Sequence, residues 1–222
     1  MVNRALDVVL LGPPGAGKGT QAKRIAAAFE LLHVSTGDLL REEVGRGTSL
    51  GEQAKVFMNR GELVPDALVG KMLACRLHTQ PAALGCAFDG YPRTTAQAQL
   101  LDGLLAELNR RVDVVLYLRV EDEEILKRLT GRRSCPACGA VYHLVTQPPK
   151  VEGVCDTCQA ALVQREDDRD EVVRERLRVY REHTAPLLTL YRGRGNLREV
   201  DGSSGADEVF EHLREVMGGV RR

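Results

Sequence analysis

The sequence predicts an α/β fold, in which a parallel sheet of the doubly wound type has helices on both faces. Short apolar runs alternate with helical stretches along the chain, as in repeated strand–helix–strand units. The first apolar run leads directly into a glycine-rich loop that opens a helix. The chain has 222 residues, 43% hydrophobic and 28% charged, which is enough for one core domain with insertions.

The first strand is predicted at 7–11, because Asp-Val-Val-Leu-Leu is a continuous apolar run typical of a central strand covered on both faces. A helix is expected from about 18 to 30. Further strands are predicted at 86–89, 112–118 and 197–200. The first two of these precede stretches rich in Leu, Ala and Glu. Ligands of such a sheet gather at the carboxyl ends of its strands.

Two segments interrupt this alternation. The first begins with Ser-Thr-Gly-Asp, the spacing of a capping box, and is predicted to form small helices. The second is rich in proline and glycine and holds four clustered cysteines. A helical stripe of apolar residues follows it, over about 169–190. We therefore expect insertions at 35–64 and 131–168 in a core made of 1–34, 65–130 and 169–222.

Charge and hydropathy exclude several classes of partner. The 31 basic and 31 acidic residues balance, and only 4% of the residues are aromatic, so neither a nucleic-acid interface nor a nucleic-acid-binding zinc ribbon is expected. No run approaches the ~18 apolar residues of a membrane span. The apolar N-terminal stretch is too short for a secretion signal. We expect a cytoplasmic protein that contacts no membrane.

The loop Gly-Pro-Pro-Gly-Ala-Gly-Lys-Gly-Thr at 12–20 predicts a P-loop NTPase-like phosphate site. Backbone N–H groups can surround a polyphosphate there, the helix N-terminus adds partial positive charge, and Lys18 reaches the terminal phosphates. Gly19 stands where the strict motif has a Mg²⁺-binding Ser or Thr. Mg²⁺ is therefore expected on phosphate oxygens and water, with Asp89 positioning that water. A helix-capping role is the alternative for Asp89.

Four cysteines predict a metal site. Cys135 and Cys138 form one Cys-x-x-Cys pair, and Cys155 and Cys158 form a second pair sixteen residues further on. We expect a closed, structural Zn²⁺ site that stabilises an insertion too small to build its own core, with Gly139 allowing a tight turn. Disulfides, another tetrahedral-site metal, or His143 replacing one cysteine are the alternatives. Cys75 and Cys86, outside the cluster, are expected to be buried.

Six segments, in order, resemble the adenylate kinase family over nearly the whole chain. They read GPPGAGKGTQ, STGDLLR, GELVPD, FDGYPRT, RLTGRR and REDD with a later RER. The inserted cysteine segment is similar to that of the long-lid bacterial branch that binds zinc. The resemblance implies reversible phosphoryl transfer between Mg·ATP and AMP to give two ADP, by a monomer whose lid closes over its substrates.

Carried over by matching motif, the resemblance implies three groups of site residues. The ATP contacts would be Gly15, Ala16, Gly17, Lys18, Gly19, Thr20, Arg132, Val141, Tyr142 and Ser204, the last at a position where the family often has Lys. The AMP contacts would be Thr36, Arg41, Glu62, Leu63, Val64, Gly90, Tyr91, Pro92, Arg93, Gln97, Arg165 and Arg176. The residues of phosphoryl transfer would be Lys18, Asp89, Arg93, Arg128, Arg132, Arg165 and Arg176. Gln97 would read the adenine edge.

Transfer to a phosphate needs charge neutralisation and alignment rather than a general base, since the acceptor is largely deprotonated at neutral pH, its second pKa lying near ~6. No Asp–His pair is expected to take part, and His33 and His143 are expected to be hydrogen-bonded structural residues. The alternatives are a nucleoside-monophosphate kinase of another base preference, such as a GTP:AMP or a UMP/CMP enzyme, and a nucleotide-gated module without catalysis. Gln97 and the long lid argue against the pyrimidine version, and the arginine set favours catalysis. Lid opening is expected to limit turnover.

Overall fold

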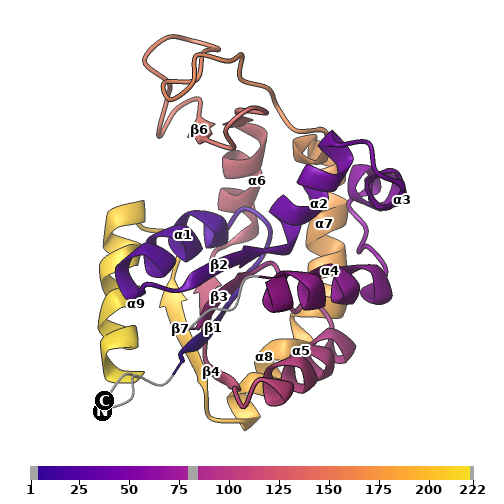
Figure 1. Ribbon diagram of the computed structural model, residues 1–222. Coiled ribbons are helices and arrows are strands. Elements are labelled where there is room, and N and C mark those ends of the chain that lie inside the picture. Colours follow the sequence, from indigo (N-terminus) through magenta and orange to yellow (C-terminus); the bar gives the residue numbers. More distant parts are fainter. Residues whose placement is uncertain (1–4, 80–84, 221–222) are drawn as a thin grey trace.

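The computed structural model describes residues 5–79 and 85–220, and its central feature is a five-stranded parallel sheet in the order β2-β3-β1-β4-β7 (Figure 1). The strands are β1 (Asp7–Leu11), β2 (Leu32–Ser35), β3 (Cys86–Asp89), β4 (Val112–Arg119) and β7 (Leu197–Asp201). The predicted α/β fold is confirmed, and β1 and β3 have the bounds expected from the sequence. The ends of the predicted core at 1–4 and 221–222, together with 80–84, lie outside the described residues.

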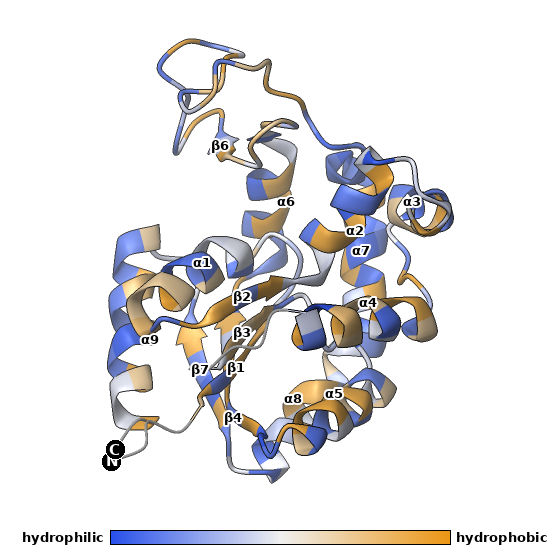
Figure 2. Cartoon of the chain, viewed as in Figure 1, coloured by the Kyte–Doolittle hydropathy of each residue, from blue (hydrophilic) through white to orange (hydrophobic). Residues whose placement is uncertain are grey.

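The sheet is buried on both faces, as the apolar run of β1 predicts. Side chains alternate along a strand, so Val8 and Leu10 face one hydrophobic cluster while Val9 and Leu11 face the other. Figure 2 shows the strands as hydrophobic ribbons between amphipathic helices. One face is covered by α1 (Lys18–Phe29) and α9 (Ala206–Val220), and the other by α4 (Asp66–Thr79), α5 (Thr95–Glu107) and α8 (Pro186–Gly193).

The first insertion consists of α2 (Thr36–Gly45) and α3 (Ser49–Arg60). The Ser35 hydroxyl caps α2 by accepting a hydrogen bond from the Asp38 N–H at 3.2 Å, as the capping-box spacing predicts. Thr48 caps α3 in the same way. The two helices touch closely at Gly51, where an added Cβ would lie 2.2 Å from the Glu43 carbonyl oxygen. Any side chain at this position would separate the two helices.

The second insertion stands above the sheet at the end of α6 (Asp122–Thr130) (Figure 1). It contains a short antiparallel pair, β5 (Arg132–Ser134) and β6 (Val141–His143), and the turn η1 (Glu166–Asp168). Its own buried apolar cluster holds only Cys135, Tyr142 and Cys155. Such a small core makes an additional cross-link necessary for a fixed structure.

The helix expected over 169–190 is interrupted. It is formed by α7 (Asp170–Val179), the π-helical turn η2 (Tyr180–Thr184) and α8. In η2 the Ala185 N–H bonds to the Tyr180 carbonyl, five residues back. Pro186 follows, and since it has no N–H it cannot continue a regular α-helical ladder. The apolar periodicity showed the helical stripe but not this widened turn.

Two further expectations differ from the structure. No strand is expected from the sequence at β2, which is only four residues long and only partly buried at Leu32 and His33, so its apolar signal is weak. Cys75, expected to be buried, is exposed on α4, whereas Cys86 is buried in β3. Cys75 lies between the helical core positions Leu73 and Leu77 and faces away from them. Among the described residues, no helix has both the length and the apolar character needed to cross a membrane.

Candidate functional site

A large cleft, with a volume of about 1480 Å³, lies at the carboxyl edge of the sheet and between the two insertions. This is where ligands of parallel α/β sheets bind. The cleft is lined by these residues of the predicted site: Gly15, Ala16, Gly17, Lys18, Gly19, Thr20, Thr36, Arg41, Glu62, Leu63, Val64, Asp89, Gly90, Pro92, Arg93, Gln97, Arg128, Arg132, Val141, Tyr142, Arg165, Arg176 and Ser204. The fold therefore brings residues from all parts of the chain to a single cavity.

The glycine-rich loop between β1 and α1 forms the floor of this cleft. Gly15 and Gly17 have φ values of 82° and 89°, which side chains of L-residues rarely permit. The Lys18 ammonium donates hydrogen bonds of 2.8 Å to the carbonyl oxygens of Gly12 and Pro13. The lysine is thus held within a loop that lines the cleft at the start of α1, where it can exchange its carbonyl partners for phosphate oxygens.

The pKa of Lys18 is lowered to about 7. Burial in the loop is the main cause, and the positive charges of Arg93 and Arg176 add to it, whereas Asp89 acts in the opposite direction. The site therefore holds more positive charge than its own carboxylates neutralise. A bound polyphosphate would relieve this excess and restore the charged form of the lysine.

Asp89 ends β3 and its side chain is 14% exposed. A Cβ added at Gly19 would lie 3.2 Å from the Asp89 Oδ2 atom. The carboxylate therefore occupies the space next to the position at which the strict motif carries a hydroxyl. The helix-capping alternative is not what the structure shows, because α5 is capped by Thr94.

His33 departs from expectation. Its Nε2 atom is buried, has no hydrogen-bond partner among the described residues, and lies 3.9 Å from the Asp89 Oδ2 atom. The parallel pairing of β2 with β3 brings the two residues together, and burial lowers the pKa of His33 below its ordinary value despite the attraction of Asp89. The neutral imidazole thus borders the carboxylate rather than acting as a hydrogen-bonded structural residue.

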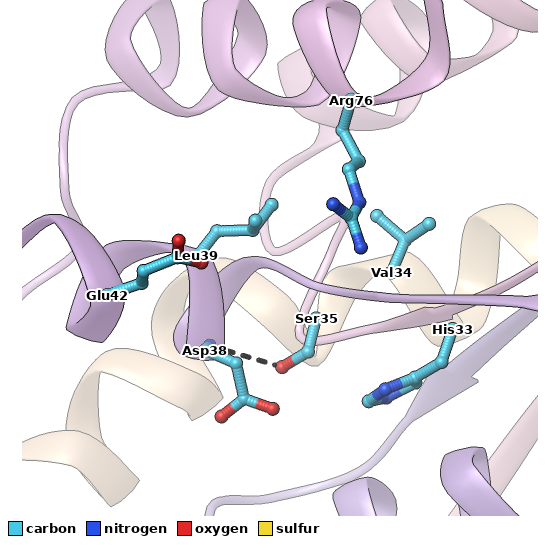
Figure 3. Close-up of a pocket in the computed structure, with 7 residues that line it drawn as sticks. All are labelled: His33, Val34, Ser35, Asp38, Leu39, Glu42 and Arg76. Atoms are coloured by element: carbon cyan, nitrogen blue, oxygen red, sulfur yellow. Dashed lines mark hydrogen bonds between the residues drawn. The ribbon is translucent and has the colours of Figure 1, made fainter. Parts of the chain in front are cut away.

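Beside His33 lies a small pocket of about 140 Å³ under the start of α2. Figure 3 shows Arg76 extending toward it from α4 and the His33 ring next to the Asp38 carboxylate. The pocket is lined by His33, Val34, Ser35, Asp38, Leu39, Glu42 and Arg76. It shares Ser35 and Asp38 with the large cleft, so it is an extension of the same polar region.

Two arginines of the cleft are held by buried acids. Arg132 donates two hydrogen bonds to the fully buried Asp168 carboxylate, with distances of 2.8 and 2.5 Å. Arg176 contacts the same carboxylate at 3.3 Å and that of Asp167 at 3.0 Å. Burial alone would raise the pKa of Asp167, but Arg176 and Arg132 lower it below its ordinary value. The two guanidinium groups are thus oriented before any ligand binds.

Three other arginines donate to neutral oxygens. Arg165 Nε donates to the Ser134 hydroxyl at 2.8 Å, Arg93 Nε to the Gly90 carbonyl at 2.9 Å, and Arg128 Nη1 to the Gly202 carbonyl at 2.7 Å. Arg128 Nε also pairs with the Glu124 carboxylate at 2.8 Å. Burial, together with neighbouring arginines, lowers the pKa of Arg93 and of Arg165 to about 10. Both side chains remain charged at neutral pH and have capacity left for anionic ligands.

Two of the predicted AMP contacts, Thr36 and Arg41, lie on α2. The Thr36 hydroxyl donates to the Gly90 carbonyl at 2.8 Å, and Arg41 pairs with Asp38 at 2.6 Å. Tyr91 is the one predicted contact that does not line the cleft, because its side chain is fully buried in the hydrophobic core. Gln97 is 2% exposed, and both ends of its amide are hydrogen-bonded, to Arg93 and to Asp66.

The four clustered cysteines meet at one point of the second insertion. Their Sγ atoms all lie within 4.8 Å of one another, and all four thiols are free. A tetrahedral site with Zn–S bonds of about 2.3 Å separates its sulfurs by about 3.8 Å, so the cluster fits a metal ion. The shortest contacts, 3.3 Å for Cys135–Cys158 and 3.6 Å for Cys138–Cys155, exceed the ~2.05 Å of a disulfide. The structure therefore favours the metal over disulfides.

The two Cys-x-x-Cys turns have the same backbone pattern. The Gly139 N–H donates to the Cys135 carbonyl and the Gln159 N–H to the Cys155 carbonyl, at 3.0 and 2.9 Å. Both donors have positive φ, 73° at Gly139 and 64° at Gln159. The sequence predicted this turn at Gly139 but not at Gln159, where no glycine indicates it. His143 is not part of the cluster, because its Nδ1 atom accepts bonds from the N–H groups of the next residues, as expected for a structural histidine.

Tyr142 connects the four clustered cysteines with the cleft. It lines the cleft, and its hydroxyl lies 3.6 Å from Cys155 Sγ and accepts a 2.9 Å hydrogen bond from the Asp156 N–H. A phenol that accepts from a backbone N–H has its proton free for the sulfur. The side chain therefore fixes β6 against one cysteine.

Sequence reasoning missed the acids that hold the cationic site. Asp167 and Asp168 were part of the quoted REDD segment but received no role, and Asp66 received none either. Asp167 and Asp168 follow shortly after Arg165 in the sequence. This closeness was a usable signal, since acids near a cluster of arginines in an α/β cleft often orient the guanidinium groups. The contact of Asp66 with Gln97, by contrast, joins residues 31 apart and has no local sign in the sequence.

A family model described as adenylate kinase matches residues 10–196. Among similar curated proteins is the adenylate kinase of Archaeoglobus fulgidus, 48% identical over 212 residues, which are 96% of this chain and 98% of that protein. The adenylate kinase of Lachnospira eligens is 46% identical over 96% of this chain and its own full length. That of a Geobacillus species is 46% identical over 97% of this chain and likewise over its full length.

Proposed function

The chain belongs to the adenylate kinase family, whose reaction is ATP + AMP = 2 ADP, and we propose that it catalyses this reaction by charge neutralisation and alignment, without a general base. The observation that carries the proposal is the convergence of Lys18 and the arginines on one cleft above the glycine-rich loop. Phosphoryl transfer proceeds through a loose transition state, so positioned positive charge accounts for most of the catalysis.

The donor subsite would be formed by the glycine-rich loop and the second insertion. The loop N–H groups and Lys18 would bind the β- and γ-phosphates, and the backbone at Val141, Tyr142 and Ser204 would contact the base. The family typically uses Mg·ATP, in which the ion screens polyphosphate charge. Asp89 would hold a water of that ion, a role supported by its place beside Gly19, where no hydroxyl competes for the space.

The acceptor subsite would lie between α2 and α5. Thr36, Arg41, Arg93 and the 62–64 segment would hold AMP, with Gln97 against its adenine. The acceptor phosphate brings its own nucleophilic oxygen, largely deprotonated at neutral pH because its second pKa is near ~6. His33 and Asp89 therefore need not act as a catalytic pair, in spite of their 3.9 Å separation.

Both insertions would close over the substrates before transfer. Water competes with AMP for the γ-phosphoryl group, so a closed cleft protects ATP from hydrolysis. We assign 35–64 to an AMP-binding unit and 131–168 to a lid, both mounted on the core formed by the rest. Arg132 and Arg165 lie at the two ends of the lid segment, so closure would carry both guanidiniums toward the transferring group. Lid opening would then limit turnover.

The four cysteines would hold a structural Zn²⁺ ion. All four ligand positions of a tetrahedral ion are filled by thiolates, which leaves none open for substrate. Iron or cobalt would satisfy the same ligands. Free thiolates persist in a reducing compartment, so we propose that the enzyme is cytoplasmic. From its family we propose that it is a monomer.

The test is phosphoryl transfer from Mg·ATP to AMP, GMP, CMP and UMP, with ADP production measured against a control without acceptor. The expected result is fast turnover with AMP alone. Transfer to another base would keep the fold and mechanism but reassign the acceptor pocket. Nucleotide binding without transfer to any acceptor would contradict the proposal and favour a nucleotide-gated module.

A further inference from the structure

The Gln97 side-chain amide is held in one orientation from both ends. The Arg93 backbone N–H donates to Gln97 Oε1 at 2.7 Å, and Gln97 Nε2 donates to Asp66 Oδ1 at 2.6 Å. A backbone N–H can only donate, and a carboxylate oxygen can only accept. Each anchor by itself identifies which end of the amide is oxygen and which is nitrogen, and the two anchors agree.

Asp66 is itself fixed by the cap of α5. The Thr94 hydroxyl donates to Asp66 Oδ2 at 3.0 Å and accepts from the Gln97 N–H at 3.0 Å. The hydrogen bonds form a closed ring through Asp66, Thr94 and Gln97, joining the start of α4 to the start of α5. Gln97 and Arg93 line the cleft, whereas Asp66 does not. Asp66 therefore acts on a ligand only through its neighbours.

We propose that Asp66 is a positioning residue that makes the acceptor subsite select adenine over guanine, by holding the Gln97 amide in this orientation. The inference rests on the proposed contact between Gln97 and the AMP base. With one N–H and one lone pair already used, Gln97 has one N–H and one lone pair left for a ligand. Adenine offers the matching edge, because its N1 accepts and its 6-amino group donates.

Guanine offers the reverse pattern, since its N1–H donates and its O6 accepts. Binding guanine at Gln97 would require the amide to flip. A flip would set Gln97 Oε1 against the Asp66 carboxylate and Nε2 against the Arg93 N–H, and would break both hydrogen bonds in a buried position. A site whose buried polar groups are left unpaired by the wrong ligand discriminates strongly against it.

The test measures kcat and KM for AMP and for GMP, with saturating Mg·ATP, in Asp66→Ala and in Asp66→Asn. Asp66→Ala removes one of the two anchors, so the ratio of kcat/KM for AMP over GMP is expected to fall about tenfold, with KM for AMP raised and kcat nearly unchanged. Asp66→Asn keeps an acceptor for Gln97 and a partner for Thr94, and is expected to restore most of the ratio. An unchanged ratio in Asp66→Ala overturns the proposal.

Two controls separate positioning from loss of structure. Asp66 is an acid in the first turn of α4, so Glu52→Gln, which removes an exposed acid from the first turn of α3, controls for the lost charge and is expected to leave the ratio unchanged. Asp66→Ser keeps a good helix start but is too short to reach Gln97. If Asp66→Ala does not fold, this variant is expected to show the same fall, and an unchanged ratio in it overturns the proposal.

A double-mutant cycle with Gln97→Ala distinguishes this inference from the proposed site. If Asp66 acts through Gln97, then Asp66→Ala changes the ratio no further in the Gln97→Ala background. An equal fall in both backgrounds overturns the positioning role. If Gln97→Ala alone leaves both KM for AMP and the ratio unchanged, the proposed AMP pocket is wrong, whatever Asp66 does.

Discussion

At the scale of single residues, the site depends on acids that receive little attention in a motif search. Asp168 is fully buried and contacts both Arg132 and Arg176. Replacing one partner of a buried ion pair leaves the other charges uncompensated, which is far more costly than the net gain from forming the pair. Asp168 is thus needed both for the stability of the cleft and for the direction in which two arginines point.

Asp168→Ala is expected to lower the free energy of unfolding by about 3–5 kcal/mol, since it removes the carboxylate that pairs with Arg132 and leaves Arg176 with that of Asp167. Urea denaturation monitored by circular dichroism measures the change. The matched control is Asp170→Ala, two residues further on, whose exposed pair with Arg174 is worth about 1 kcal/mol or less. Equal losses in the two variants would contradict the role given to Asp168.

Lys18 gives a pH dependence of stability. Its folded-state pKa is lowered to about 7 from an ordinary value of 10.5, chiefly by burial. Between these two values the unfolded chain binds a proton that the folded chain does not, so the free energy of unfolding rises with pH across this window. The penalty of burying the charged lysine is therefore greatest below pH 7.

As the pH is raised from 7 toward 10, the unfolding free energy of the substrate-free wild type is expected to increase relative to that of Lys18→Met. Denaturation series at fixed ionic strength measure it. With saturating ATP the slope should disappear, because the phosphates favour the charged lysine. A flat difference without nucleotide would show that Lys18 keeps its ordinary pKa.

At the scale of elements, the buried core of the second insertion lies at the cysteine cluster. Only three residues form this core, and two of them are the cysteines Cys135 and Cys155. The third is Tyr142 of β6, which also lines the cleft. Binding of a metal ion by the four cysteines would thus be coupled both to the folding of the insertion and to the geometry of the proposed base contacts.

Removal of the metal with a chelator, verified by elemental analysis, is expected to lower the melting temperature and to open the 131–168 segment to proteases. The parallel sheet and the helices that cover it have their own hydrophobic cores, so their circular dichroism signal should remain. Activity should fall with the loss of the lid and return when Zn²⁺ is added back. Full activity and unchanged melting in metal-free protein would rule out a structural role.

How far the sequence predicts each element depends on how local its signal is. The β1 run and the following loop are continuous in sequence, and they were found with their bounds. The four residues of β2 are too few and too polar to show a period, and the η2 turn is set by Pro186 and by packing rather than by pattern. The approach of His33 to Asp89 follows from strand pairing, which only the fold reveals.

At the scale of the whole molecule, the site is assembled from parts of the chain that are far apart. The loop after β1, the ends of β2, β3 and α6, and α7 each supply residues to one cavity. All the site residues that the family resemblance named, except Tyr91, line this cavity, because motif order is preserved along the chain. The resemblance did not provide the acids that orient them, since those contacts depend on side-chain geometry in three dimensions.

Arg176→Lys tests whether the largely buried arginines of the cleft neutralise the transferring phosphoryl group. Lysine keeps the charge but not the planar, multidentate geometry of the guanidinium. The measurement is the single-turnover rate constant of ADP formation, together with equilibrium binding of ATP and AMP. Arg174→Lys, an exposed arginine on the same helix, is the control.

We expect Arg176→Lys to lower the transfer rate constant by about 10²-fold or more, while nucleotide affinities change less than about tenfold and Arg174→Lys behaves as wild type. An unchanged transfer rate constant in a folded Arg176→Lys enzyme would contradict the claim that this guanidinium stabilises the transition state.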